Sequence, residues 1–309
     1  MRTRTPPGEP ARPGALYLLC LMLAGLALVA CHPGNEEAKR LRGVCQAGDV
    51  AACNQLARKL QKGEYVLRDD THAAELFEQA CTGGVGDGCA SLGVAYQQGT
   101  GVKRDSARAL NFLRQGCERG GMDGCARLGV LYRQGAGVAR DTARAAALFQ
   151  QSCDASNQFG CAHLGTMYAA GEVVPQDFTR AAALFKRSCD DKVAVGCLGL
   201  GRLHAAGNGV PRNDSTAAAL FDKSCDGGEA AGCFEYAVVL EAGRGVPPQS
   251  IRAMELFTDA CDQRHGEACA RAATLYDGLG SRQRAQSLRR RSCEYGYAPA
   301  CEKPKPAGA

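Results

Sequence analysis

The sequence predicts an all-α solenoid of helix–turn–helix repeats, because cysteines, small residues and capping residues all recur along it at one fixed step. From residue 45 onward the cysteines fall in C-x7-C pairs, and successive pairs lie 36 residues apart until the last step, which is 32. A fixed period in this range indicates a stack of similar units, since one helix pair cannot bury its apolar face alone. The pairs are Cys45 with Cys53, Cys81 with Cys89, Cys117 with Cys125, Cys153 with Cys161, Cys189 with Cys197, Cys225 with Cys233, Cys261 with Cys269 and Cys293 with Cys301.

The first helix of a unit can be read from one copy of the repeat. Leu92, Gly93 and Tyr96 recur at helical spacing with Cys89 one turn earlier, which indicates a short helix with one apolar face. The Gly93 position is Gly or Ala in the other units, so we expect close backbone approach there to outweigh the helix-propensity cost of Gly, about 1 kcal/mol. The segment Gly99–Val102 then ends the helix and turns the chain.

The second helix begins after a residue that suits an N-cap. Ala109, Phe112 and Leu113 follow at helical spacing and are predicted to face inward, and the helix is expected to stop near Cys117. Each cap is worth about 1 kcal/mol over Ala. The capping position is occupied by Asp69, Asp105, Asp141, Asp177 and Asn213 in successive units.

Departures from the repeat are local, and His204 and Leu240 in place of Tyr96 are among them. Glu172-Val173 replaces the second turn glycine, and Gln249 replaces the capping Asp. In the last unit Arg289 stands where Phe257 would recur, which is the polar face that a terminal cap requires. Nearby, Arg282, Arg284, Arg289, Arg290 and Arg291 form the one dense basic stretch, interpreted as a solvated end cap.

The cysteine spacing favours a disulfide within each pair. On a continuous helix, residues i and i+8 lie about 12 Å apart, whereas a disulfide needs Cα atoms within about 7 Å. The chain must therefore turn between the two cysteines, and Gly83-Gly84, Gly120-Gly121, Gly227-Gly228 and Asp190-Asp191 supply turns. Sixteen cysteines allow roughly two million pairings, and the repeat favours the local one. Metal binding is the alternative, but C-x7-C is not a zinc spacing and the five His show no paired spacing, so we expect neither a metal nor a cofactor.

The N-terminus is predicted to be a targeting segment. A basic, Pro-rich stretch precedes Ala15–Ala30, an apolar run that suits a signal peptide and is short for a membrane-spanning helix. It ends in Leu28-Val29-Ala30-Cys31, which resembles a bacterial lipobox and implies that Cys31 receives the lipid; an ordinary cleaved signal peptide is the alternative. We therefore divide the chain into a signal peptide (1–30), a lipid-anchored tether (31–36), a solenoid of about seven repeats plus caps (37–301) and a disordered tail (302–309).

The repeat pattern L-G-x-x-Y-x-x-G-x-G-V-x-x-D, as it stands from Leu92 to Asp105, resembles the Sel1-like repeat, a relative of the tetratricopeptide repeat. The resemblance covers roughly residues 45 to 301 and implies a right-handed solenoid whose first helices line the concave face. The cysteine spacing within such repeats resembles the Helicobacter cysteine-rich proteins. Some members of that family bind penicillins or hydrolyse β-lactams weakly, which the resemblance raises as a possibility for this chain without assigning residues to it.

The sequence contains none of the familiar catalytic motifs, so no catalysis is expected. The formal net charge of +5 is too weak to indicate nucleic-acid binding. Polar positions that vary between units on the first helices are the candidate binding surface: Arg127, Arg133, His163, Arg202, Glu235 and Arg271.

These observations predict an envelope lipoprotein that acts as a scaffold for a protein or peptide partner. Its membrane contact would be the lipid on Cys31, and the lipobox resemblance with His32 after the cysteine permits the outer membrane, facing the periplasm, or the cell surface. Two alternatives stay open. One is a penicillin-binding protein or weak β-lactamase, and the other is a structural lipoprotein associated with peptidoglycan.

Overall fold

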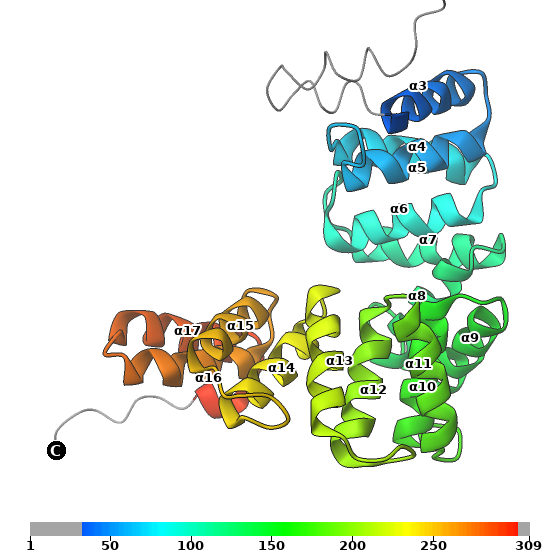
Figure 1. Ribbon diagram of the computed structural model, residues 1–309. Helices are drawn as coiled ribbons and strands as arrows, with labels where there is room; N and C mark the ends of the chain where they lie inside the picture. Colours follow the sequence, from blue (N-terminus) through cyan, green and yellow to red (C-terminus); the bar gives the residue numbers. More distant parts are fainter. Residues whose placement is uncertain (1–32, 302–309) are drawn as a thin grey trace, which may run out of the picture. The chain divides into compact units, whose positions relative to one another are not determined.

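The computed structural model describes residues 33–301, and this range is helical throughout (Figure 1). It contains fifteen α-helices, one short 3-10 helix and no strand. The predicted signal peptide, Cys31 and the predicted tail at 302–309 lie outside the described residues. The helices are α3 (Pro33–Gln46), α4 (Val50–Lys62), α5 (Asp70–Thr82), α6 (Gly86–Gln98), α7 (Ser106–Glu118), α8 (Met122–Gln134), α9 (Thr142–Asp154), α10 (Gln158–Ala170), α11 (Phe178–Asp190), α12 (Ala194–Ala206), α13 (Asp214–Asp226), α14 (Ala230–Ala242), α15 (Ser250–Asp262), α16 (Gly266–Gly278), α17 (Arg282–Glu294) and η1 (Ala298–Cys301).

The helices form two compact units, divided within α8 after Leu128. In unit 1, helices α3 to α7 pack each against the next. In unit 2, helices α9 to α17 do the same, and α10 also contacts α12, which contacts α14. Each even-numbered helix from α4 onward is the first helix of a pair and each odd-numbered one is the second. The prediction of an all-α stack of helix–turn–helix units is confirmed.

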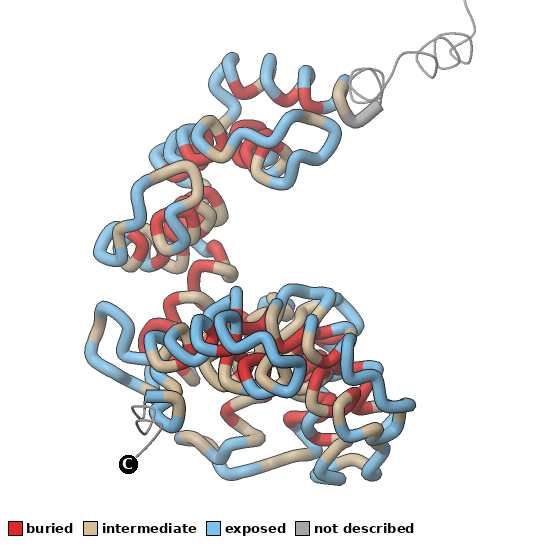
Figure 2. The backbone as a smooth tube through the Cα atoms, turned by 90° about the vertical axis from the view of Figure 1, so that its left-hand side faces the viewer, coloured by how far each residue is buried: buried red, intermediate tan, exposed pale blue. Residues whose placement is uncertain are grey.

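The core of each pair lies between its two helices, as the buried segments in Figure 2 show. The aromatic position of the second helix is buried in every pair where Phe occupies it. The first helix has a small residue opposite this ring because a larger side chain would collide with it. A Cβ on Gly129 would lie 2.8 Å from Phe149 Cε1. The predicted close approach is therefore a helix backbone packed against an aromatic side chain. The buried rings are Phe77, Phe149, Phe185, Phe221 and Phe257.

The predicted N-caps are present at the second helices. The Asp105 side chain accepts hydrogen bonds from the backbone N–H groups of Ala107 and Arg108, so it satisfies two donors that the helix leaves unpaired. Each of Asp69, Asp141, Asp177 and Asn213 accepts one such bond, from the backbone N–H three residues later. Gln249 makes none, as its departure from the pattern indicated.

The turn between the two helices of a pair keeps one left-handed residue even where glycine is absent. Gly101 and Gly209 have φ of 72° and 67°. Val173 and Tyr65 occupy the same position with φ of 68° and 60°. A Cβ in this conformation costs about 1–2 kcal/mol, so these two side chains occupy a backbone conformation that they disfavour.

Each of the eight predicted cysteine pairs is joined by a disulfide, with Cα–Cα distances between 4.3 and 4.9 Å. No described cysteine is free, so the local pairing accounts for every cysteine between residues 33 and 301. The prediction of a solenoid cross-linked by C-x7-C disulfides is confirmed. The bridges join Cys45 with Cys53, Cys81 with Cys89, Cys117 with Cys125, Cys153 with Cys161, Cys189 with Cys197, Cys225 with Cys233, Cys261 with Cys269 and Cys293 with Cys301.

The second cysteine of each bridge opens the next helix pair. Cys81 lies in the last turn of α5 and Cys89 in the first turn of α6, so the bridge links one pair of helices to the next. The loop between them contains a left-handed residue, Gly84 at φ 93°, and in another loop Lys192 takes that conformation at φ 62°. The second cysteines on the first helices are buried, whereas Cys301 on η1 is exposed; the buried ones are Cys53, Cys89, Cys125, Cys161, Cys197, Cys233 and Cys269.

The structure differs from the predicted boundaries at the N-terminal side. Residues 33–36, assigned to the tether, form the first turn of α3. Pro33 suits the first helical position because its missing N–H would have no partner there. Glu36 accepts a hydrogen bond from Lys39 at 2.7 Å, which supports the same turn. At the other end, Arg289 is exposed and pairs with Asp277, as expected for a polar cap.

Candidate functional site

The six predicted binding residues all lie on first helices. Arg127 is in unit 1, where its Nε lies 2.6 Å from Asp123 Oδ2 on the same helix, α8. The other five belong to unit 2, and the structure brings them together only in part. Their helices are α8 for Arg133, α10 for His163, α12 for Arg202, α14 for Glu235 and α16 for Arg271.

Arg202 and Glu235 form one ion pair between neighbouring first helices. Nε and Nη2 of Arg202 lie 2.9 and 2.8 Å from Oε1 of Glu235. The pair is partly open to solvent, with the arginine side chain 53% and the glutamate side chain 26% exposed. Two residues that were predicted to bind a partner therefore bind each other, and they connect adjacent repeats.

Arg133 is held in the same way, by a residue outside the predicted set. Its Nε and Nη2 donate to the two carboxylate oxygens of Glu172 at 3.0 and 3.3 Å. The hydrogen bond from Arg133 lowers the pKa of Glu172, and the positive charges of Arg133 and Arg140 act in the same direction. Glu172 is in the turn after α10, so this pair also joins neighbouring repeats.

The remaining two residues have distinct surroundings. The His163 ring is stacked on Phe149 with centroids 5.1 Å apart and meets the edge of Phe159 at 4.5 Å. His163, predicted to contact a partner, therefore packs against two aromatic rings. Arg271 Nη1 lies 3.3 Å from Glu241 Oε2, which links α16 to α14.

Two small pockets open beside these ion pairs. One is lined by Val130, Arg133, Gln134, Arg140, His163 and Glu172 and has a volume of about 250 Å³. The second has a volume of about 240 Å³, and Arg202, Ala205, Ala206, Asp214, Glu235 and Arg244 contribute to its lining. Both fall below the range of about 300–1,000 Å³ that is typical of small-molecule sites. Each is large enough for one side chain of a partner.

The two pockets occupy equivalent positions of the repeat, two steps of 36 residues apart. Most of their lining positions correspond, but the chemistry differs: His163 is replaced by Glu235, and Glu172 by Arg244. The backbone positions of the two pockets are the same and their charged side chains differ. This arrangement is expected of a surface that binds one partner at several points.

The Sel1 repeat family model matches six consecutive segments, at residues 50–85, 86–121, 123–157, 159–192, 194–229 and 230–265, which is more than half of the chain. The chain belongs to the Sel1 repeat family. Sel1 repeats typically mediate contacts between proteins. No curated protein matches the chain.

Two solved structures with TM-scores of 0.50 and 0.55 give the same fold. The chain is similar to c5321, described as a protective antigen of uropathogenic Escherichia coli with an SLR fold, at 25% identity and a TM-score of 0.50, covering 85% of this chain and 57% of that one. It therefore spans little more than half of that antigen's length. A Sel1 repeat protein from Oxalobacter formigenes gives 22% identity and a TM-score of 0.55, covering 74% and 99% of the two chains. Helicobacter pylori cysteine-rich protein B gives 28% identity and a TM-score of 0.34, covering 44% and 97%.

Sequence reasoning missed the turn residues of this Sel1-repeat surface. Glu172 and Arg244 occupy one position of the turn that follows the first helix, and Arg140 lies in such a turn as well. The signal was present, because the position of Glu172 and Arg244 varies between Glu, Thr, Ala, Asn and Arg from unit to unit. Only variable positions on helices were predicted to bind, although turns commonly carry binding residues.

A histidine near the second pocket of the Sel1-repeat array has a structural role. His265 is the N-cap of α16, where Nδ1 accepts the N–H of Ala268 at 3.2 Å. Its ring stacks on Phe234 with centroids 4.6 Å apart. Burial lowers the pKa of His265, while the negative charges of Glu267, Glu235 and Glu229 oppose this shift.

The recurring serines of the Sel1 repeats are buried hydrogen-bond donors. Ser188 Oγ donates to the carbonyl of Gln158 at 2.9 Å, and Ser224 and Ser292 make equivalent bonds to Ala194 and Gly266. Each bond ties the end of a second helix to the first helix that precedes it in sequence, beside a disulfide. Within residues 33–301, none of the helices is long and apolar enough to span a membrane.

Proposed function

We propose that this Sel1-repeat protein is a lipid-anchored scaffold of the bacterial envelope, which binds a protein or peptide partner along the first helices of unit 2. The observation that carries the proposal is the pair of equivalent pockets, whose positions are fixed by the repeat and whose charged side chains differ. The family supports a role in contacts between proteins.

The pockets define the kind of partner that fits. They are two repeats apart, and packed helices are spaced by about 8–10 Å, so they lie roughly 16–20 Å apart. An extended peptide advances about 3.3 Å per residue. A partner strand could therefore place two side chains, about five or six residues apart, in the two pockets. The pocket with Arg133, Arg140 and Glu172 carries excess positive charge and favours an acidic side chain.

The N-terminal pattern and the cysteines support the cell compartment that we propose. The apolar run before Cys31 and the lipobox-like residues support export and lipidation at Cys31. The eight disulfides require an oxidising compartment, which the periplasm and the cell surface provide. We therefore place the chain on the outer membrane, facing the periplasm, or on the cell surface.

Photo-cross-linking in living cells tests the scaffold. A photoreactive phenylalanine at Ala206, an exposed residue of the second pocket, should capture a partner protein. The matched control is Ala219, an exposed alanine on α13 that does not line the pocket. Specific adducts at 206 and none at 219 would support the proposal. Equal adducts at both positions, or adducts with peptidoglycan alone, would overturn it.

Two further measurements test the remaining parts of the proposal. The intact mass of the mature protein should equal that of a chain that begins at Cys31 and carries acyl chains. Cys31→Ser should release the chain from the membrane fraction. Hydrolysis of nitrocefin by the purified wild-type protein at a rate typical of an enzyme would contradict a scaffold without catalysis. Only background hydrolysis is expected.

A further inference from the structure

Exposed apolar side chains gather at one kind of turn. Among residues 33–301 the exposed large apolar residues are all in a turn that joins the first helix of a pair to the second, or within two residues of it. They are Tyr65 (41% exposed), Leu67 (74%), Val173 (57%), Ile251 (74%) and Leu279 (67%). In the same described range, none of these exposed apolar residues lies at the helix ends that are joined by disulfides. The turns within helix pairs therefore carry the exposed apolar side chains, whereas the helix ends joined by disulfides do not.

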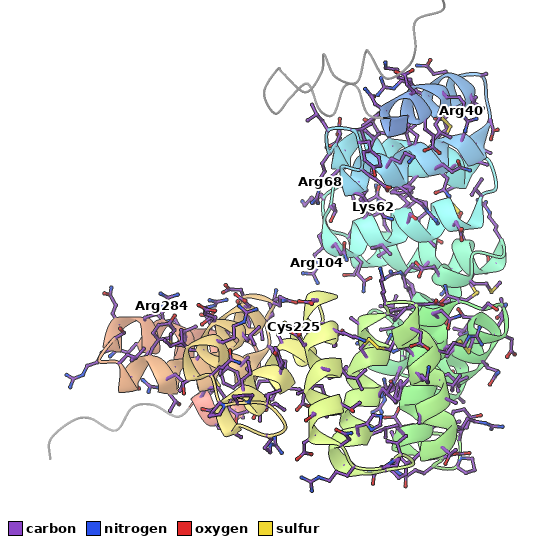
Figure 3. The ribbon with its side chains drawn as sticks, viewed as in Figure 1. Arg40, Lys62, Arg68, Arg104, Cys225 and Arg284 are labelled. Carbon is purple, nitrogen blue, oxygen red and sulfur yellow. A yellow bond between two sulfur atoms is a disulfide. The ribbon has the colours of Figure 1, made fainter. Side chains whose placement is uncertain are left out.

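In unit 1 this edge also presents cations. Tyr65 and Leu67 lie in the turn between α4 and α5, just after Lys62, and Lys103 and Arg104 lie in the turn between α6 and α7. The α6–α7 turn touches the start of α5, directly after the α4–α5 turn, because Gly101 packs against the backbone carbonyl of Asp70 with no room for a Cβ. Figure 3 shows Arg68 and Arg104 at the same edge of unit 1. We call Lys62, Tyr65, Leu67, Lys103 and Arg104 the turn edge of unit 1.

The charge of this edge is available for a partner. Within the described residues Lys62, Lys103 and Arg104 are exposed and form no ion pair. Most of the nearby acids are engaged: Asp69 and Asp105 cap helices, and Asp70 pairs with Arg68 at 2.8 Å. Glu64 is the acid in the α4–α5 turn that remains. Exposed cations beside exposed apolar side chains are typical of surfaces that bind an anionic bilayer.

The start of α3 lies at the same edge. Glu37, near the start of α3, pairs with Lys59 near the end of α4 at a distance of 3.0 Å. Figure 1 shows the beginning of α3 on the side of unit 1 where the α4–α5 turn lies. Cys31 precedes Pro33 by two residues, which span at most about 7 Å. A lipid on Cys31 would therefore be attached within that distance of the start of α3.

We propose that the turn edge of unit 1 rests on an anionic phospholipid bilayer, with Tyr65 and Leu67 in the interface and Lys62, Lys103 and Arg104 against lipid phosphates. This inference rests on the proposed lipidation of Cys31. A single acyl chain binds membranes only reversibly, and a basic or apolar patch beside it strengthens the attachment. In this orientation the helix ends of unit 1 that are joined by disulfides face away from the membrane.

Tryptophan fluorescence can test this contact, because the chain contains no Trp. In Leu67→Trp the new indole reports on the turn edge. The matched control is Thr82→Trp, exposed at the opposite end of α5, about 18 Å away along the helix. A hexahistidine tag placed before residue 32 of the mature chain holds each protein on vesicles with nickel-chelating lipid. The vesicles contain phosphatidylethanolamine with phosphatidylglycerol, or phosphatidylcholine alone.

On the phosphatidylglycerol vesicles we expect a blue shift and loss of iodide quenching for Trp at 67 and no change for Trp at 82. Lys103→Gln and Arg104→Gln should each lower the equilibrium constant for contact about fivefold, since each cation near an anionic surface contributes a factor of that size. An unshifted spectrum at 67, an equal shift at 82, or an equal response on phosphatidylcholine alone would overturn the inference. The tag replaces the lipid, so this result is separate from the intact-mass test of Cys31.

Discussion

Arg202 of α12 and Glu235 of α14 are bound to each other through a single carboxylate oxygen, at 2.9 and 2.8 Å from two guanidinium nitrogens. Neither residue belongs to the repeated framework, yet together they connect adjacent repeats at the mouth of a pocket. A side chain that varies between units can thus serve both packing between repeats and recognition of a partner. The two roles can be separated by experiment.

Reversing the pair separates the two roles. Arg202→Glu or Glu235→Arg alone should lower the free energy of unfolding by less than about 1 kcal/mol, because the pair is partly exposed. The double variant should regain this stability but not partner capture at Ala206, because the pocket then presents reversed charges. Urea unfolding and the cross-linking yield measure the two effects. Partner capture restored together with stability would show that the pair serves packing alone.

Substitutions at two equivalent left-handed turn positions should change the free energy of unfolding in opposite directions. Val173→Gly should raise the free energy of unfolding by about 1 kcal/mol, since it removes the cost of a β-branched side chain at φ 68°. Gly209→Ala should lower it by more than about 1 kcal/mol, because a Cβ there would also lie 2.6 Å from the carbonyl carbon of Phe178. Urea unfolding monitored by circular dichroism measures both. A destabilised Val173→Gly would refute the assignment of strain.

The disulfides are expected to dominate stability. Each closes a loop of about nine residues, worth roughly 2.5 kcal/mol in the loop-entropy model. Replacing Cys153 and Cys161 together by Ala should lower the free energy of unfolding by about that amount. Full reduction removes eight such constraints, whose sum exceeds the roughly 5–15 kcal/mol typical of whole domains, so dithiothreitol should abolish cooperative melting. A melting curve that dithiothreitol leaves unchanged would contradict this role.

Acid should weaken the α16 cap through His265. Burial lowers its pKa in the folded protein, so the unfolded chain, with a histidine pKa of about 6.5, binds the proton more readily. The contribution of His265 to stability is therefore present above about pH 6.5 and is lost as the pH falls below it. In His265→Asn the side chain can still cap the helix but does not titrate. The difference in unfolding free energy between about pH 7.5 and pH 5 should be smaller in this variant than in the wild type.

Much of the fold could be predicted from local patterns. Asp105 caps α7 and Cys81 pairs with Cys89 because these features depend on residues a few positions apart, and each repeat provides an independent copy of the pattern. The first turn of α3 was assigned to a tether instead, since Pro33 stands where the capping Asp recurs in later units. The site was predicted less completely: the variable helix positions gave Arg202 and Glu235 but not the turn residues Glu172 and Arg244.

The sequence by itself determined the period, the helix boundaries within each repeat and the cysteine pairing, because these depend on interactions repeated at fixed short spacing. Only the tertiary structure decided which variable side chains meet. Arg133 reaches Glu172 across 39 positions of the chain, and Tyr65 and Leu67 share an edge with Lys103 and Arg104. Such contacts depend on how far each helix pair is displaced and rotated on the next. That geometry is set by packing across the whole interface between repeats and leaves no spacing rule in the sequence.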